Sequence, residues 1–291
     1  MSNDKSFLAL FAEQVARSHE LNAKEEGDYI GDDGLLHCGK CHELREQPVT
    51  VEDENGNPIV FRPYIPCRCI MAKINKMQAA QENAEKADAR AAARNASCIP
   101  PQYRDVTFDT FKKNASNAAI LHMTKRFATN FSQILQEGGG LLLHGNVGTG
   151  KTYAAACIAN YLLDHDFTVF FTSTYTMTQL RDEAQEAAYS ARISKCSLLI
   201  VDDLGAERSS QFAQEKVFGY IDTRCNAEKP MILTTNLDFK AMLSPETEAE
   251  QRIYDRILKK CFPVAFAGES WRRGEARSNF EKMKALLQGS D

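Results

Sequence analysis

The segment HGNVGTGKT, residues 144–152, decides the fold of this chain. From Gly145 to Thr152 it matches G-x-x-x-x-G-K-[ST] without a mismatch, and the glycines of that pattern let backbone N–H groups turn towards a phosphate. The flanks supply the required context, because GLLLH before the loop is an apolar, strand-like run and KTYAAACIANYLLDH after it has helical character. The sequence therefore predicts a strand, a phosphate-binding loop, and a helix whose positive N-terminal end faces the anion.

The loop residues have separate expected roles. We expect Lys151 to reach the β and γ phosphates of a nucleotide, and the hydroxyl of Thr152 to hold Mg²⁺. The expected nucleotide-binding residues are Gly145, Asn146, Val147, Gly148, Thr149, Gly150, Lys151 and Thr152.

A second apolar strand, SLLIVDDLG at 197–205, ends in two carboxylates. Asp202 is expected to hold Mg²⁺ through water, and Asp203 to polarise the water that attacks the phosphate. Two acids at a strand end also suit a turn. Their place after the phosphate-binding loop favours catalysis.

A third apolar strand, PMILTTNLD at 230–238, ends in Thr235 and Asn236. An amide at the tip of the strand beside the phosphate-binding loop can sense the γ-phosphate and orient water. The tripeptide TTN alone is also compatible with turn chemistry. Its order after the other two motifs favours the first interpretation.

Composition and length limit the number of domains and the class of protein. The chain has 291 residues, is 43% hydrophobic and 25% charged, and lacks an apolar run near the ~20 residues of a membrane span. We expect two domains, no contact with a membrane, no secretory signal and a cytoplasmic protein. The formal charge of −4 means that nucleic-acid binding requires a local basic patch. From about residue 100, strand-like and helix-like segments alternate, which predicts an α/β domain.

Four of the nine cysteines form a cluster in the sequence, within HCGKCH and PCRC. Cys38, Cys41, Cys67 and Cys69 give C-x2-C followed by C-x-C, and four thiolates on two tight turns predict a structural Zn²⁺ site. The second pair is one residue shorter than the usual C-x2-C. His37 or His42 can replace one cysteine, so the ligand set stays open.

The remaining N-terminal sequence predicts simple elements. Residues 5–24 place apolar side chains at helical spacing, and the runs on either side of NGN between the cysteine pairs predict a β-hairpin. Residues 70–96 predict a helix that is polar nearly all round, as in a linker. The expected domains are a helix and zinc-binding domain at 1–69, a helical linker at 70–98 and an ATPase domain at 99–291.

The three strands, in this order, resemble those of the AAA+ ATPases. The segments LLLHGNVGTGKTYAAACIANYLL, LLIVDDLGAE, ILTTNL and IPPQYRDVTFDTF resemble the helicase-loader branch, the DnaC/DnaI family with IstB as its close relative, over roughly residues 99–280. The resemblance implies an AAA+ P-loop domain with a parallel central sheet, and ATP and Mg²⁺ as ligands. Asp203 stands where many AAA+ motors have Glu. A shorter carboxylate reaches less far towards water, so we expect slow hydrolysis that works as a switch.

The resemblance also implies roles for three arginines. In the family, the segment QRIYDRILKK presents an arginine finger to the nucleotide of a neighbouring subunit, and Arg252 and Arg256 are both candidates on one helix face. The segment GESWRRGEAR resembles sensor 2, with Arg272 as the contact to the γ-phosphate in its own subunit.

The expected N-terminal zinc domain distinguishes between the functions that are known in this family. Loaders of the DnaI type carry such a domain and dock it on the replicative helicase, whereas IstB-type helpers generally lack it. We therefore expect an ATP-dependent helicase loader whose partners are a replicative DNA helicase, single-stranded DNA and further copies of the chain. Two alternatives remain: an IstB-type helper of a transposase, and a zinc-dependent binding adaptor whose ATP site is largely structural.

Overall fold

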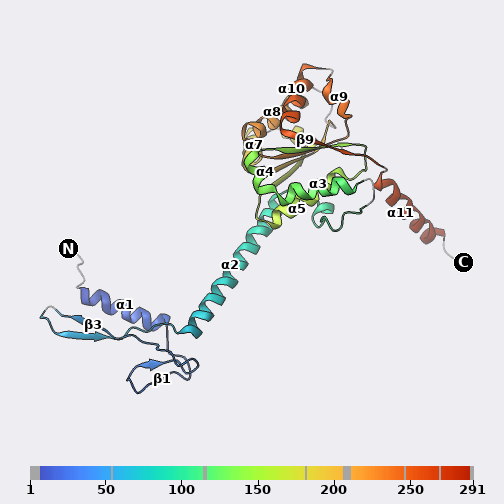
Figure 1. The fold of residues 1–291 in the computed structure, drawn as a ribbon. Coiled ribbons are helices and arrows are strands. Elements are labelled where there is room, and N and C mark those ends of the chain that lie inside the picture. Colours follow the sequence, from blue (N-terminus) through green and yellow to red (C-terminus); the bar gives the residue numbers. More distant parts are fainter. Residues whose placement is uncertain are drawn as a thin grey trace. The chain divides into compact units, whose positions relative to one another are not determined.

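The computed structural model describes residues 7–53, 55–113, 117–180, 182–205, 211–245, 247–268 and 270–288 (Figure 1). The chain divides into two compact units, Met1–Ala87 and Asp88–Asp291. Within the described ranges, every helix is too short or too polar to cross a lipid bilayer.

The N-terminal unit holds one helix, two small antiparallel ribbons and the start of a long helix. Its elements are α1 (Phe7–Leu21), β1 (Tyr29–Ile30), β2 (Leu36–His37), β3 (Val49–Glu52), β4 (Pro58–Phe61) and α2 (Arg68–Ala96), the last of which continues into the second unit. Strands β3 and β4 pair antiparallel, with Val51 opposite Ile59. The predicted hairpin is confirmed.

Helix α1 confirms the predicted N-terminal helix and lies against the hairpin. The ring of Phe11 meets that of Phe61 edge-on at 5.0 Å, and the backbone N–H of Tyr64 donates to the hydroxyl of Ser18 over 3.0 Å. No described residue of α1 is fully buried, and Phe7 is 68% exposed. The helix therefore covers little of its own unit and leaves apolar surface open.

A buried arginine joins the parts of this unit. The side chain of Arg45 is fully buried and pairs with the equally buried Asp28 at 2.7 Å. The Arg45 guanidinium also donates to the carbonyls of Asn22 and Ala23, just after α1. Because a buried charge requires compensation, this pair ties α1 to the loops that follow it.

The second unit is built on a five-stranded parallel sheet in the order β6-β7-β8-β5-β9. Its strands are β5 (Gly140–Gly145), β6 (Val169–Ser173), β7 (Leu198–Leu204), β8 (Met231–Thr235) and β9 (Cys261–Phe266). The strands expected after residue 139 and at 197–205 and 230–238 are β5, β7 and β8. The outer strands β6 and β9 carry no motif, and the sequence analysis did not single them out.

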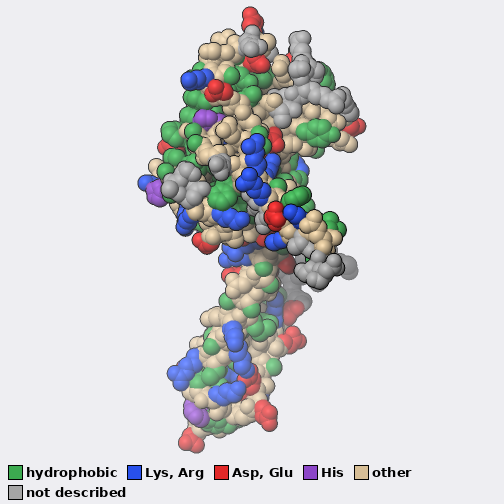
Figure 2. Space-filling view, turned by 90° about the vertical axis from the view of Figure 1, so that its right-hand side faces the viewer, with side chains coloured by type: hydrophobic (Ala, Val, Ile, Leu, Met, Phe, Trp, Pro, Cys, Tyr) green, Lys and Arg blue, Asp and Glu red, His purple; other side chains and the backbone are tan. Residues whose placement is uncertain are grey.

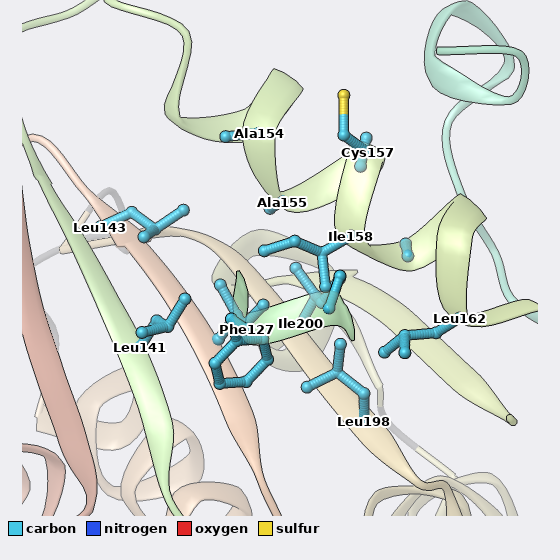
Figure 3. Close-up of a cluster of buried hydrophobic side chains, with 14 of the residues drawn as sticks. Phe127, Leu141, Leu143, Ala154, Ala155, Cys157, Ile158, Leu162, Leu198 and Ile200 are labelled. Atoms are coloured by element: carbon cyan, nitrogen blue, oxygen red, sulfur yellow. The ribbon is translucent and has the colours of Figure 1, made fainter. Parts of the chain in front are cut away.

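Helices cover both faces of this sheet. The helices around the sheet are α3 (Ala118–Thr129), α4 (Phe131–Glu137), α5 (Lys151–Asp164), α6 (Thr174–Gln179), α7 (Glu183–Lys195), α8 (Gln211–Asn226), α9 (Phe239–Leu243) and α10 (Glu248–Lys260), with a 3-10 turn at Pro101–Tyr103. The last helix, α11 (Trp271–Gln288), extends away from the sheet (Figure 1). Successive strand residues point to opposite faces, so Ile200 packs under α5 while Leu199 and Val201 pack in the second core with α7, α8 and α10. Figure 3 shows Ile158 and Leu162 of α5 directed towards Ile200 and Leu198. Burial on both faces explains why these strands are continuously apolar.

The last turns of α2 belong to the second unit and are attached to α5. Arg90 pairs with Asp166 at 2.7 Å, and Arg94 pairs with Asp164 at 2.5 Å. Arg94 also donates to the amide oxygen of Asn160 over 3.2 Å. Within the second unit, the last turns of α2 are thus bound to the helix that follows the phosphate-binding loop and to the turn directly after that helix.

Candidate functional site

The phosphate-binding loop has the backbone shape that its glycines permit. Gly145 and Gly148 have φ angles of 133° and 82°, and Gly150, with φ 99°, caps α5. A Cβ on Gly145 would lie 2.2 Å from the carbonyl oxygen of Phe266, and one on Gly148 would lie 2.0 Å from Ser270 Oγ. Both positions therefore require glycine for conformation and for space.

Lys151 lies at the first position of α5 and is 5% exposed. Its ammonium donates to the carbonyl oxygens of Gly145 and Asn146, each over 2.8 Å, and to Asn236 Oδ1 over 2.7 Å. Burial lowers the pKa of Lys151 below its ordinary value, although Asp203 and Asp202 oppose that shift. The positive charge is held in the loop by oxygen atoms that a phosphate can replace.

Thr152 and Asp202 meet beside this lysine. The Thr152 hydroxyl donates to Asp202 Oδ1 over 2.8 Å, and the hydroxyl of Thr234 donates to the same oxygen over 2.6 Å. Burial raises the pKa of the Asp202 carboxyl, against the lowering effect of both hydroxyls. A hydroxyl and a carboxylate in contact form the hard oxygen pair that Mg²⁺ prefers.

Asp203 is exposed and lies on a bulge of β7. Its φ of 55° is in the left-handed region, and its backbone N–H donates to Thr234 Oγ1 over 3.0 Å. The amide of Asn236 donates to Asp203 Oδ1 over 3.4 Å while its oxygen accepts from Lys151. One side-chain amide thus connects the lysine of the loop with the second acid.

Lys151, Thr152, Asp203 and Asn236 border a pocket of about 380 Å³. It is lined by the loop, Asp203, Asn236 and Arg272, and by aromatic side chains that the sequence analysis missed: Tyr103, Phe111, Tyr153 and Trp271. Tyr153 contacts Phe111 and Tyr103 edge-on, with ring centroids 5.4 Å and 6.4 Å apart. Tyr103 and Phe111 lie in the segment IPPQYRDVTFDTF and Trp271 lies in GESWRRGEAR, both quoted above for the family resemblance, but no role at the site was assigned to these side chains or to Tyr153.

Of the three candidate arginines, one lies at the pocket. Arg272 follows Trp271, whose backbone N–H donates to the carbonyl of Gly148 over 3.0 Å, so the start of α11 is fastened to the loop. Arg252 and Arg256 lie on α10, outside the lining of the pocket. Arg256 pairs with Asp222 on α8 and lies over the ring of Phe218, whereas Arg252 is exposed.

The four predicted cysteines come together in the N-terminal unit. The sulfurs of Cys38, Cys41, Cys67 and Cys69 all lie within 4.8 Å of one another. Sulfurs bound tetrahedrally at about 2.3 Å from Zn²⁺ stand about 3.8 Å apart. The cluster therefore has the size and the donor set of a zinc site.

Two local structures hold the cysteine cluster. In the first, the backbone N–H of His42 donates to the carbonyl of Cys38 over 2.9 Å, which closes a tight turn. In the second, Cys67 and Cys69 flank the first residue of α2, so a helical turn brings the short C-x-C pair to one side. His37 directs its ring nitrogens to Asp33 and to the His42 carbonyl, and His42 Nδ1 bonds Tyr29. In the described residues, neither histidine joins the cluster.

The sulfurs also influence one another electrostatically. A hydrogen bond from the Glu43 backbone lowers the pKa of the Cys41 thiol to about 7. Cys41 in turn raises the pKa of Cys69 to about 11. Four sulfurs this close resist full ionisation unless a cation neutralises them, as a bound metal does.

Comparison with known families decides which proteins this chain belongs with. A family model described as IstB-like ATP binding protein matches residues 73–279, more than half of the chain. The chain belongs to the IstB-like ATP-binding family. The matched region of this IstB-like protein contains the phosphate-binding loop and both strand-end motifs, and the resemblance drawn from those motifs is confirmed.

Known relatives of this IstB-like protein include replication and transposition proteins. The replicative helicase loader DnaC of Buchnera aphidicola subsp. Acyrthosiphon pisum is 25% identical over 180 residues, 59% of this chain and 71% of that protein. A putative insertion sequence ATP-binding protein of Sinorhizobium fredii is 30% identical over 148 residues, 49% of each. A crystal structure of the DnaC helicase loader superposes with a TM-score of 0.51 and 24% identity, covering 58% of this chain and 100% of that one. The predicted α/β fold, an AAA+ P-loop domain with a parallel sheet, is confirmed.

Proposed function

We propose that the protein is an ATPase that loads a replicative DNA helicase. The observation that carries this proposal is the Asn236 amide, which connects Lys151 to Asp203 in the pocket beside Thr152 and Asp202. Groups for binding phosphate, holding a metal and activating water thus share one site. The similarity to the helicase loader DnaC supports helicase loading as the process that ATP hydrolysis at this site controls.

In this proposal each group has one task. Backbone N–H groups of the loop and the Lys151 ammonium bind the β and γ phosphates of ATP. Thr152 and Asp202 hold Mg²⁺, which neutralises charge on the phosphates. Asp203 accepts the proton of the attacking water, and Asn236 orients that water.

We propose that arginines complete the site in an assembly of copies of the chain. Arg272 lies at the pocket of its own subunit and contacts the γ-phosphate there. Arg252 is our candidate for the finger that reaches a neighbouring subunit, because it is exposed. Arg256 is held by Asp222 and Phe218 within its own subunit. A finger in trans makes hydrolysis depend on assembly.

We propose that the N-terminal unit binds the helicase. In this view residues 1–69 form a zinc-binding domain with Cys38, Cys41, Cys67 and Cys69 as ligands, residues 70–98 a helical linker and residues 99–291 the ATPase domain. Exposed apolar side chains on α1 and the hairpin, Phe7 at 68% and Val60 at 55%, offer a contact surface. Apolar surface of this kind suits a protein partner.

Single-stranded DNA is the proposed second partner, bound by the ATPase domain. Figure 2 shows lysine and arginine side chains gathered on one face of the larger unit. Because the chain carries a net charge of −4, binding must come from such a local group. DNA binding should therefore weaken steeply as salt rises, since it depends on counterion release.

Co-purification tests this function directly. The full chain is mixed with the replicative helicase of the source organism, with and without ATP. We expect a complex with wild type and with Lys151→Ala, and loss of the complex with Cys38→Ser. If Cys38→Ser binds the helicase as well as wild type does, the proposal that the N-terminal unit binds the helicase is wrong.

A second candidate is an ATPase that assists a DNA transposase. The similarity to the insertion sequence ATP-binding protein of Sinorhizobium fredii favours it. Binding to a transposase, with no binding to the helicase, would move this candidate ahead.

A further inference from the structure

Thr234 is a buried residue of β8 that contacts both acids of the ATP site. Its side chain is 0% exposed. The hydroxyl donates to Asp202 Oδ1 over 2.6 Å and accepts from the backbone N–H of Asp203 over 3.0 Å. A threonine hydroxyl has one donor and two acceptor positions, so a single group satisfies both contacts.

The need for such a group comes from the bulge in β7. Val201 pairs with Leu233 and Leu204 with Thr235, so two residues of β7 stand opposite Thr234 alone. A bulge interrupts the ladder of backbone hydrogen bonds and redirects the chain. The Thr234 hydroxyl takes the place of a backbone acceptor for Asp203.

The bulge also holds Asp203 in a left-handed conformation, which residues other than glycine adopt rarely. Its φ of 55° is left-handed, which costs free energy for residues other than glycine. The Thr174 hydroxyl, also buried, donates to the Asp203 carbonyl over 3.0 Å. Thr234 and Thr174 thus fix the peptide groups on both sides of this Cα, which presents the carboxylate to Asn236.

We propose that Thr234 is a positioning residue that sets both acids of the ATP site through one hydroxyl. It turns the Asp202 carboxylate towards Thr152, and it keeps the backbone of Asp203 in place. The inference rests on the ATP hydrolysis proposed above. It also explains why a threonine occupies this fully buried position, just as the other buried threonine of β8, Thr235, uses its hydroxyl to donate to the Leu204 carbonyl.

Three variants of the full chain test this role. Thr234→Val keeps the shape and removes the hydroxyl, and Thr234→Ser keeps the hydroxyl. Thr172→Val is the matched control, because Thr172 is also a buried strand residue but its hydroxyl bonds Tyr189 instead. ATP affinity is measured with Mg²⁺ and with EDTA, turnover is measured as kcat and KM, and thermal melting checks the fold.

We expect Thr234→Val to lower kcat by about 10- to 100-fold, as is usual when a group supporting a metal ligand is lost. The gain in ATP affinity that Mg²⁺ gives should shrink by a similar factor, while affinity in EDTA stays near wild type. Thr234→Ser should recover both quantities to within a few fold, and Thr172→Val should match wild type.

Three results would overturn the proposal: a Thr234→Val protein with wild-type kcat and Mg²⁺ response, equal losses in Thr234→Ser, or equal losses in Thr172→Val. The last two would assign the effect to packing. A wild-type protein that binds ATP without hydrolysing it would contradict the proposed function instead. In that case the Mg²⁺ response of Thr234→Val still decides whether Thr234 positions the acids.

Discussion

The ammonium of Lys151 donates a hydrogen bond to Asn236 Oδ1 over 2.7 Å, although the two residues are 85 positions apart in the chain. The lysine comes from the start of α5 and the asparagine follows β8, the strand next to β5. A phosphate that draws the lysine away frees Asn236 Oδ1 to accept a hydrogen bond from water, while the amide nitrogen of Asn236 still donates to Asp203. Phosphate binding in the loop can therefore change the hydrogen bonds of Asn236, which contacts Asp203.

Replacing this lysine should weaken nucleotide binding strongly. We expect Lys151→Ala to weaken ATP binding by about 30-fold or more, because the loop loses the positive charge that faces the phosphates. The fold should persist, since alanine is a good helix former. Calorimetric titration with ATP measures the effect, and Lys125→Ala, an exposed lysine on α3, is the control. Equal ATP affinity in both variants would contradict the assignment of the loop.

The second acid should be needed for hydrolysis and not for binding. We expect Asp203→Asn to lower kcat by about 100- to 10,000-fold, the usual effect of losing a general base. ATP affinity should be kept because Thr152 and Asp202 are unchanged. Asp105→Asn, an exposed acid outside the pocket lining, is the control. Unaltered turnover in Asp203→Asn would mean that another group activates the water.

The cysteine cluster predicts one Zn²⁺ per chain. Cys38→Ser should lose the metal and unfold the N-terminal unit, because metal binding and folding of a small domain are coupled. The ATPase domain has its own two-faced core and should keep ATP binding. Elemental analysis and thermal melting measure both effects, with Cys98→Ser as the control outside the cluster. Protein purified without chelator that contains no zinc would end this prediction.

Arg45 should be essential to the N-terminal unit. Arg45→Ala leaves the carboxylate of Asp28 buried without its partner, and breaking such a pair costs about 3–5 kcal/mol. Lys73→Ala is the control, because that lysine is half exposed and its pair with the partly exposed Glu25 contributes little to stability. Urea unfolding of the full chain, followed through zinc release, measures the difference. Similar midpoints for both variants would show that the buried pair contributes little.

The two arginines of α10 should have different effects. Arg252→Ala is expected to reduce DNA-stimulated hydrolysis in the assembly by about 1,000-fold, the lower range for an arginine finger, and to spare ATP binding by single subunits. Arg256→Ala should cost at most about 1 kcal/mol of stability, since its pair with Asp222 is partly exposed. The opposite pattern of ATPase rates would assign the finger to Arg256.

The sequence by itself determined the class of fold and much of the chemistry. The loop at 145–152, the acids at the end of β7 and the amide after β8 are read from short spacings, because each motif combines a strand with the residues at its carboxyl end. In a parallel sheet the carboxyl ends of neighbouring strands meet at one edge, so residues of separate motifs can be expected together. The cysteine pairs are visible for the same reason, since each pair lies on one local turn.

Only the tertiary structure decided which partners those residues have. The pairing of Arg256 with Asp222, the burial of Arg45 against Asp28 and the two contacts of Thr234 join segments that are distant in sequence. The extra residue in β7 depends on the register with β8, which no local pattern specifies. A sequence motif identifies functional groups that lie close together in the chain. The orientation and the partners of each side chain depend on the helices and strands that pack against it.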